Sequence, residues 1–220
     1  ITISVASHPL IGFSDVTPEL KRLKSQAGLN CAELLRVTQL LKAARRASKG
    51  IKPDDDGRLV LLPEMAESLY YDDTIISRID DAIISEEEVS DYASTELRNI
   101  RRRKAAENQA VRDKLSAVIR SRELSKYLQD AIITMRDGRF VVPVKSEYRG
   151  YIKGLVHGES SSGATVFIEP IGVVDANNKL RELENEERRE VERILMQLSD
   201  MLRPFAEDIE YDLEIMAYLD

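Results

Sequence analysis

The chain of 220 residues contains no tryptophan, one cysteine and two histidines, and only 5% of its residues are aromatic. A single Cys31 excludes an intramolecular disulfide and a cysteine-ligated zinc cluster, and it fits a reducing compartment. We therefore expect the cytoplasm as the location. No apolar run approaches the roughly 18 to 20 residues that span a bilayer, and the start Ile-Thr-Ile-Ser lacks the basic and then apolar pattern of a signal peptide. The sequence predicts no membrane partner.

Signatures of catalysis are also missing. The pattern G-x-x-x-x-G-K-[ST], which holds nucleotide phosphates, does not occur, and residues 158–163 fail the nucleophile-elbow pattern because Ser162 stands where its last glycine would be. His8 and His157 are far apart, and we expect His157 to be a partly exposed structural residue. Residues 54–57 lack the ligand spacing and closing glutamate of a calcium loop. The sequence thus predicts no catalytic residue, metal site or cofactor in this chain.

Charge is abundant and unevenly placed. Charged residues make up 32% of the chain, which is typical of elongated helical proteins, and the net charge is −7. Residues 98–153 carry 15 Lys and Arg against 6 Asp and Glu, whereas the remainder carries 17 against 33. A basic segment in an acidic chain suits local contact with a polyanion, because phosphate contacts come mainly from Lys and Arg. The cations between Arg98 and Lys104 fit a solvated helix face equally well.

Residues 1–95 predict a compact helical core. Thr17-Pro18-Glu19 places a capping hydroxyl before a proline and opens a helix that Gly28 should end. Asn30 and Glu33 form a capping-box pair that opens the next helix. Two further helices are expected over residues 63–70 and 74–84.

Two long runs, residues 96–128 and 176–203, predict helices that pack antiparallel as a hairpin. Their seam residues recur at steps of three and four, which marks contact between two helices. The seam positions are Leu97, Ile100, Lys104, Asn108, Val111, Leu115 and Val118 in the first run, and Leu180, Leu183, Glu187, Val191, Ile194, Leu198 and Met201 in the second.

Matching these two sets of seam positions predicts the register of the two helices. Facing residues should have numbers that sum to about 298, so that Val118 lies near Leu180, Val111 near Glu187, and Leu97 near Met201. Pro204 should kink or break the second helix, after which residues 204–220 return into the core.

Residues 129–175 predict a small β-rich unit at the tip of this hairpin, so the fold class is mainly α with a small sheet. Strands are expected over residues 140–145, around residues 152–156, and over residues 164–169. In the first, Phe140, Val142 and Val144 alternate with Val141, Pro143 and Lys145, and a turn over residues 148–150 leads into the second. Pro143 cannot donate to a ladder and should lie in an edge or bulged strand. The segment Ser160-Ser161-Ser162-Gly163 fits either a simple turn or a loop whose amides meet a phosphate.

Three further segments have distinctive sequences: Ile11-Gly12-Phe13-Ser14-Asp15-Val16, Lys126-Tyr127-Leu128-Gln129-Asp130, and the expected helix VVDANNKLRELENEERREVERIL from residue 173. Together with the β-rich, glycine-containing segment over residues 136–170, they resemble the type-two branch of the MutS family over nearly the whole chain. The resemblance implies a helical core, long antiparallel lever helices and a small clamp that closes over nucleic acid. Residues 1–95 would be the core, 96–128 and 176–203 the levers, and 129–175 the clamp.

The resemblance also implies the activity of the whole protein. Type-two MutS proteins are ATP-driven homodimers with a nuclease domain, related to mismatch repair proteins, and are associated with suppression of recombination through branched DNA and with rescue of collided ribosomes. The ATPase with its ATP and Mg²⁺, and the endonuclease, would lie outside this chain, which we expect to be a non-enzymatic internal fragment.

The resemblance assigns contact with DNA or ribosomal RNA to five cations of the clamp region. These residues are Arg136, Arg139, Lys145, Arg149 and Lys153. The alternative is a structural helical spacer whose tip binds another protein or the partner protomer. Binding that weakens steeply as salt rises would favour the nucleic-acid clamp.

Overall fold

A computed structural model describes residues 12–52 and 61–219. His8 and the loop at residues 54–57 lie outside the described residues. The chain divides into two compact units, residues 1–95 with 190–220, and residues 96–189. We call the first the helical unit and the second the sheet unit, and we describe each by itself. Most of the described chain is helical and its larger sheet is small and antiparallel, which confirms the predicted fold class at this level.

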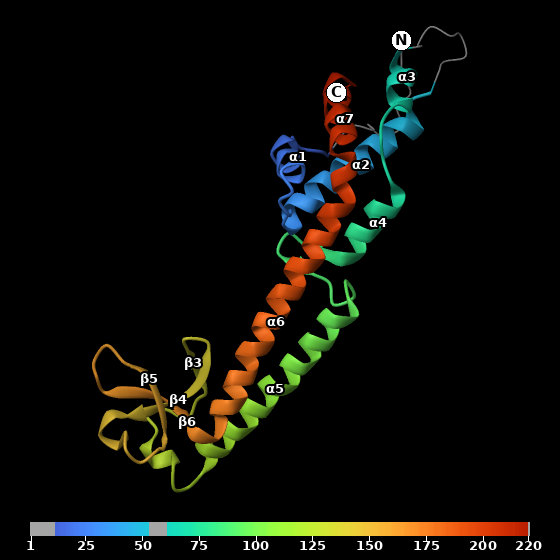
Figure 1. Ribbon diagram of the computed structural model, residues 1–220. Helices are drawn as coiled ribbons and strands as arrows, with labels where there is room; N and C mark the ends of the chain where they lie inside the picture. The colour runs from blue at the N-terminus through green and yellow to red at the C-terminus, as the bar shows by residue number, and fades with distance from the viewer. Residues whose placement is uncertain (1–11, 53–60, 220) are drawn as a thin grey trace. The chain divides into compact units, whose positions relative to one another are not determined.

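The helical unit consists of helices and one short hairpin (Figure 1). Its elements are α1 (Thr17–Lys24), α2 (Cys31–Gly50), α3 (Leu61–Glu67), α4 (Asp73–Ala82), β1 (Ile83–Ser85), β2 (Glu88–Val89), the C-terminal part of α6 (Ile171–Leu202), the 3-10 turn η3 (Arg203–Phe205) and α7 (Ala206–Leu219). Leu20, Leu34, Leu40, Ile79 and Ile209 are fully buried and come from four of these helices. Burial of apolar side chains between amphipathic helices therefore holds this unit together.

The helix ends in this unit follow local chemistry. At α2 the Asn30 side chain accepts from the Glu33 amide and the Glu33 side chain accepts from the Asn30 amide, which confirms the predicted capping box. The prediction that Gly28 ends α1 is wrong. Gln26 takes the left-handed conformation, with φ 63°, and Gly28 instead packs closely, since an added Cβ would lie 3.1 Å from Cε of Met196.

The C-terminal ends of α6 and α4 agree with the sequence prediction to different degrees. The break at Pro204 is confirmed, because α6 ends at Leu202 and Pro204 lies in the 3-10 turn before α7. The helix expected over residues 74–84 ends earlier, at Ala82. Ile83 instead starts β1 and pairs with Val89, in keeping with the preference of β-branched residues for strands.

In the sheet unit, a four-stranded antiparallel sheet follows one helical segment along the chain and precedes another (Figure 1). Its elements are α5 (Thr95–Arg120), the 3-10 turn η1 (Ser125–Tyr127), β3 (Thr134–Arg136), β4 (Arg139–Lys145), the 3-10 turn η2 (Ser146–Tyr148), β5 (Gly154–Glu159), β6 (Thr165–Pro170) and the N-terminal part of α6. The strand order is β3-β4-β6-β5. One core joins Val111 and Leu115 of α5, Val142 of β4, Ile168 of β6 and Leu180 of α6.

The sequence predicted that Pro143 lies in an edge or a bulged strand, but β4 lies between β3 and β6 in the strand order and pairs with β6 without a register shift. β3 pairs only with residues 139–141, so beside Pro143 the neighbour on that side is the segment that contains Gln129. The Pro143 carbonyl accepts a hydrogen bond from the Gln129 amide at 2.9 Å. The nitrogen and the carbonyl of one strand residue point to the same side, so the proline nitrogen also faces the Gln129 segment and not β6. The missing donor therefore costs the β4–β6 ladder nothing.

The predicted hairpin helices do lie antiparallel within the sheet unit, but their register differs from the prediction. Glu187 pairs with Arg101 and Lys104 rather than facing Val111, and Val111 shares a core with Leu180. The sum of facing numbers is therefore near 290 and not 298, a shift of about two helical turns. The shift brings the Glu187 carboxylate to two cations, whereas the predicted register would have placed it against an apolar side chain.

Candidate nucleic-acid interface

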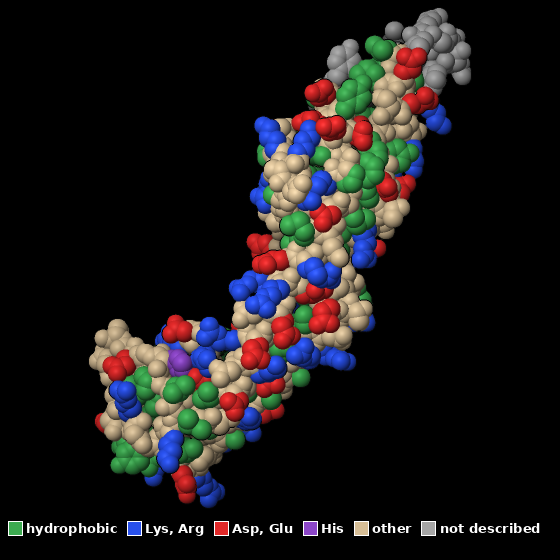
Figure 2. Space-filling view, in the orientation of Figure 1, with side chains coloured by type: hydrophobic (Ala, Val, Ile, Leu, Met, Phe, Trp, Pro, Cys, Tyr) green, Lys and Arg blue, Asp and Glu red, His purple; other side chains and the backbone are tan. Residues whose placement is uncertain are grey.

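The two units carry opposite charge. The sheet unit has 19 Lys and Arg against 14 Asp and Glu, a net charge of +5, whereas the helical unit has 13 against 25, a net charge of −12. Lys and Arg side chains lie on the visible surface of the sheet unit among acidic ones (Figure 2). Which of these cations are available to a polyanion depends on the ion pairs that they make within the chain.

Three cations in the first half of α5 are engaged by α6. Arg101 Nε lies 2.8 Å from a Glu187 oxygen, Lys104 donates to the other oxygen, and Arg103 lies 3.2 Å from Glu186. Burial acts to raise the pKa of Glu187, but the hydrogen bonds from Lys104 and Arg101 outweigh it and hold that pKa below its ordinary value. Much of the basic run on α5 therefore serves the contact between the two helices.

Arg139, one of the five predicted contact residues, is part of an internal network. Its guanidinium donates to Glu169 at 2.8 Å and to Asn178 at 2.7 Å, and Glu169 is completely buried. His157 Nε2 lies 2.6 Å from the second Glu169 oxygen, and Asn177 donates to the first. Charged groups are rarely buried unless paired, so Arg139 satisfies a buried carboxylate. His157 is the partly exposed structural residue that the sequence predicted.

Two of the other predicted contact residues lie against aromatic rings. The guanidinium carbon of Arg136 is 4.0 Å from the centroid of the Phe167 ring, and the Lys145 ammonium is 5.9 Å from that of Tyr148. Both distances fall within the range of cation–π attraction. Arg136 is exposed and Lys145 is half-buried. An aromatic ring holds such a cation in place without neutralising it, so its charge stays available to a phosphate.

Arg149 and Lys153 complete the predicted set, and both are exposed. Arg149 lies 3.9 Å from Glu159, and both side chains are more than half exposed. An ion pair of this length at the surface contributes little, so water or a phosphate can compete for the guanidinium. Four of the five predicted residues therefore keep an accessible charge, whereas the charge of Arg139 is paired with Glu169.

Sequence reasoning missed Lys126 and three tyrosines. The Lys126 ammonium is 4.9 Å from the centroid of the Tyr127 ring, and Tyr127, Tyr148 and Tyr151 lie in contact with one another. A signal was present, because basic residues alternate with tyrosines in Lys126-Tyr127 and in the segment over residues 145–153. Interleaved cations and aromatic rings are typical of surfaces that bind nucleic acid.

The loop at Ser160–Gly163 is a turn. The Gly163 amide donates to the Ser160 carbonyl at 2.9 Å, and the Ser160 amide donates to the Thr165 carbonyl at 2.8 Å. The Thr165 amide donates to the Ser160 hydroxyl at 3.1 Å. Since these amides are already engaged within the loop, the interpretation as a simple turn is favoured over a phosphate-cradling loop.

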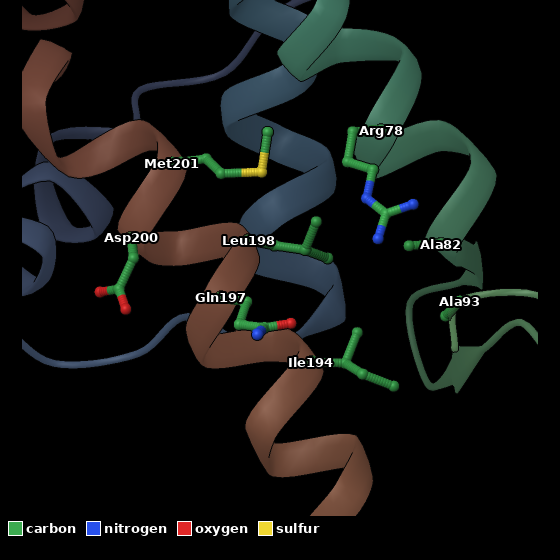
Figure 3. Close-up of a pocket in the computed structure, with 8 residues that line it drawn as sticks. All are labelled: Arg78, Ala82, Ala93, Ile194, Gln197, Leu198, Asp200 and Met201. Atoms are coloured by element: carbon green, nitrogen blue, oxygen red, sulfur yellow. The ribbon is translucent and has the colours of Figure 1, made fainter. Parts of the chain in front are cut away.

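A hollow of about 410 Å³ lies in the helical unit between α4, α6 and the segment that contains Ala93 (Figure 3). Its lining includes Arg78, Ile194, Gln197 and Leu198. Asp200 points away from Arg78, and its carboxylate pairs with Arg203 at 2.6 Å. The hollow thus lacks the convergent polar groups of a catalytic site. Over residues 12–52 and 61–219, no group of three His, Cys, Asp or Glu side chains could hold a metal ion.

In the part of the chain that the structure describes, no helix combines the length and the apolar character needed to cross a membrane.

No protein-family model matches the chain. Curated proteins named Endonuclease MutS2 do match it. The chain is 45% identical to the one from Clostridioides difficile (strain 630) and 44% identical to the one from Alkaliphilus oremlandii (strain OhILAs), in each case over all of this chain and 28% of the relative.

The same name belongs to a relative from Acetivibrio thermocellus, which is 40% identical over 96% of this chain and 27% of its own length. The chain therefore spans little more than a quarter of the length of the curated relatives that it matches. High identity over the full chain agrees with the resemblance carried by its motifs: the chain belongs to the type-two MutS family.

Proposed function

We propose that the sheet unit is a clamp that binds nucleic acid through phosphate contacts of Arg136, Lys145, Arg149 and Lys153. The observation that carries this proposal is the division of its cations into two groups. Arg139 and three cations of α5, Arg101, Arg103 and Lys104, are used in internal ion pairs, whereas these four lie at the surface or against aromatic rings. Accessible Lys and Arg side chains are the groups that neutralise phosphates.

In the whole protein, this clamp would act together with an ATPase dimer that uses ATP and Mg²⁺ and with an endonuclease. The relatives are named endonucleases, which supports a nuclease in the whole protein. The nucleic acid would be branched DNA, in suppression of recombination, or the RNA of collided ribosomes. These roles come from the family and extend the contact proposed for the four cations.

Salt dependence of binding tests the proposal. The chain should bind duplex DNA, branched DNA and ribosomes more weakly as salt rises, because each phosphate contact releases counterions. Alanine at Arg136, Lys145, Arg149 and Lys153 should lower the magnitude of the slope of log affinity against log salt by up to about 3.6 on duplex DNA, at about 0.9 for each contact.

A matched control removes the same charge from the helical unit. Lys24, Lys42, Arg45 and Lys49 make surface ion pairs there, and their joint replacement by alanine should leave the slope unchanged. If both fourfold variants keep their helical circular dichroism and bind all three ligands like the native chain, the phosphate contacts do not exist.

A structural helical spacer is the second candidate function. The ion pairs of Arg101, Arg103 and Lys104 with α6 favour it, because three basic side chains of α5 then hold the two helices together. A spacer would bind a protein partner through apolar contacts, and such binding would change little with salt.

A further inference from the structure

Three tyrosines of the sheet unit form one stacked cluster. The rings of Tyr127 and Tyr151 are nearly parallel, with centroids 4.7 Å apart and an interplanar angle of 28°. Tyr148 meets Tyr151 edge to face at 5.8 Å and Tyr127 at 5.2 Å. Tyr127 and Tyr148 pack against the core of the unit, whereas Tyr151 is 60% exposed. The cluster thus runs from the core to an outermost ring that water can reach.

The backbone holds these rings in place. Tyr127 ends η1 and its amide donates to the Leu124 carbonyl at 3.0 Å, while the Tyr151 amide donates to the Tyr148 carbonyl at 3.0 Å. The nearby Ile152 is buried and anchors the chain directly after Tyr151. Two χ angles and an anchored backbone leave the outer ring little conformational freedom to lose on binding a ligand.

Two cations lie over rings of the cluster, and two more flank Tyr151 in the chain. Lys126 lies over the ring of Tyr127 and Lys145 over that of Tyr148. Arg149 and Lys153 lie two residues before and after Tyr151 in the chain, and both are exposed. A large exposed ring with cations around it differs from a hydrophobic protein-binding patch, which is depleted in lysine at its centre.

We propose that Tyr151 is a stacking platform for unpaired nucleobases, with the neighbouring cations receiving the phosphates of the same strand. The proposal rests on the proposed function and adds the class of ligand: a single-stranded or splayed segment rather than a closed duplex. Every base has a π face that can stack on tyrosine, whereas bases inside a duplex are already stacked on each other. Charge complementarity between the cations and a sugar-phosphate strand selects nucleic acid as the occupant.

Replacement of Tyr151 by leucine or phenylalanine tests the platform. Both variants keep an apolar cover over Tyr127, but only phenylalanine keeps an aromatic face. Fluorescence anisotropy would compare the binding of labelled oligo(dT), oligo(U) and a fully paired duplex of equal length. We expect Tyr151→Leu to lower the affinity for oligo(dT) or oligo(U) by about fivefold to 100-fold, Tyr151→Phe to retain it, and neither to change the duplex affinity. The two oligonucleotides separate a DNA source of unpaired bases from an RNA source.

A tryptophan reporter gives a direct signal of stacking. The chain contains no tryptophan, so Tyr151→Trp creates a single indole at the platform. Oligonucleotides should quench its fluorescence on binding, because bases stack on the indole. Tyr211 of α7, which is 56% exposed in the acidic helical unit, provides the control, and Tyr211→Trp should show no quenching.

The outcomes separate the platform from the proposed function. If Tyr151→Leu binds oligo(dT) and oligo(U) as tightly as the native chain while duplex binding stays salt-dependent, the platform is refuted and the phosphate contacts stand. If no nucleic acid binds at low salt, the proposed function fails and the platform fails with it. Quenching at position 211 equal to that at position 151 would also refute a specific stacking site.

Discussion

Glu187 of α6 accepts a hydrogen bond from Arg101 of α5 at 2.8 Å, and Lys104 donates to the second oxygen of the same carboxylate. The Glu187 side chain is only 18% exposed, so these two cations compensate a partly buried charge. This arrangement fixes the register of the two helices within the sheet unit. A polar residue inside an apolar seam commonly has this effect.

Replacement of Glu187 by glutamine should destabilise the sheet unit by about 1 kcal/mol at pH 7, because both cations lose a charged partner and are partly exposed to water. The pKa of Glu187 is depressed in the folded state, so its contribution is present above about pH 4.5 and is lost as the pH falls below that value. The difference between variant and native chain should therefore shrink from pH 5 to pH 3. Hydrogen exchange of the α5 amides measures this difference in stability at each pH.

Glu186→Gln provides the control for this prediction. Glu186 and Arg103 form a more exposed pair at 3.2 Å, whose loss should cost less than about 0.5 kcal/mol. Equal effects of the two substitutions would contradict a special role of Glu187.

Asp212 predicts a pH dependence of opposite sign in the helical unit. Burial raises the pKa of its carboxyl group to about 7, although the Tyr70 amide donates to it at 3.0 Å and acts in the other direction. The folded chain then holds a proton that the unfolded chain releases near pH 4, so stability should fall as the pH rises from about 4 to about 7. Asp212→Asn should remove this fall and stabilise the unit at pH 8 by on the order of 1 to 3 kcal/mol.

Urea unfolding at pH 5 and at pH 8 checks this expectation. Glu214→Gln is the matched control, since Glu214 also lies on α7, is exposed, and is not among the groups that shift the pKa of Asp212. An Asp212→Asn variant with the same pH profile as the native chain would show that Asp212 does not titrate in this range.

Gly154 should tolerate no side chain. A Cβ added there would lie 2.2 Å from the Glu169 carbonyl oxygen and 2.7 Å from Cγ2 of Ile168, so the β5–β6 contact would have to move. We expect Gly154→Ala to destabilise the sheet unit by about 2 kcal/mol or more. Gly172 in the first turn of α6 has open space around it, and Gly172→Ala should be neutral or stabilise by up to about 1 kcal/mol. Thermal unfolding followed by circular dichroism compares the two, and similar melting temperatures would contradict the close approach at Gly154.

Arg139 and Arg149 should respond in opposite ways to replacement by alanine. Arg139→Ala leaves the buried Glu169 carboxylate without its guanidinium partner and should cost about 3 kcal/mol or more. Arg149→Ala removes only a weak surface pair and should leave stability within about 0.5 kcal/mol while weakening nucleic-acid binding. Denaturation and salt-dependent binding of both variants test this division of roles. A stable Arg139→Ala chain with reduced affinity would reverse it.

Local chemistry predicted much of the fold. The Asn30 and Glu33 pair, the break at Pro204 and the strand over residues 140–145 each depend on neighbours in sequence, and the structure contains all three. β3 was missed because only three residues, Thr134–Arg136, form it, too few to show a period. The predicted register of the hairpin was wrong, because periodicity shows only which face of a helix is apolar. The axial offset between the two helices depends on individual contacts such as that of Glu187 with Lys104.

The candidate site was harder to predict for a similar reason. In sequence, Arg139 looks like the other cations of its segment, and its partner Glu169 is thirty residues away. Only the pairing of β4 with β6 shows that one cation is engaged and the other four are accessible. The tyrosine cluster likewise joins residues from two separate 3-10 turns, which periodicity cannot bring together.

The buried Glu169 carboxylate also bears on how the sheet unit folds. Its hydrogen-bond partners come from β4, β5 and α6, through Arg139, His157 and Asn177. A partly formed sheet that lacked any one of these segments would bury a charge with incomplete compensation, which raises its free energy. Intermediates with a single strand detached are therefore disfavoured, and β4, β5, β6 and the first turns of α6 should open and close as one cooperative foldon.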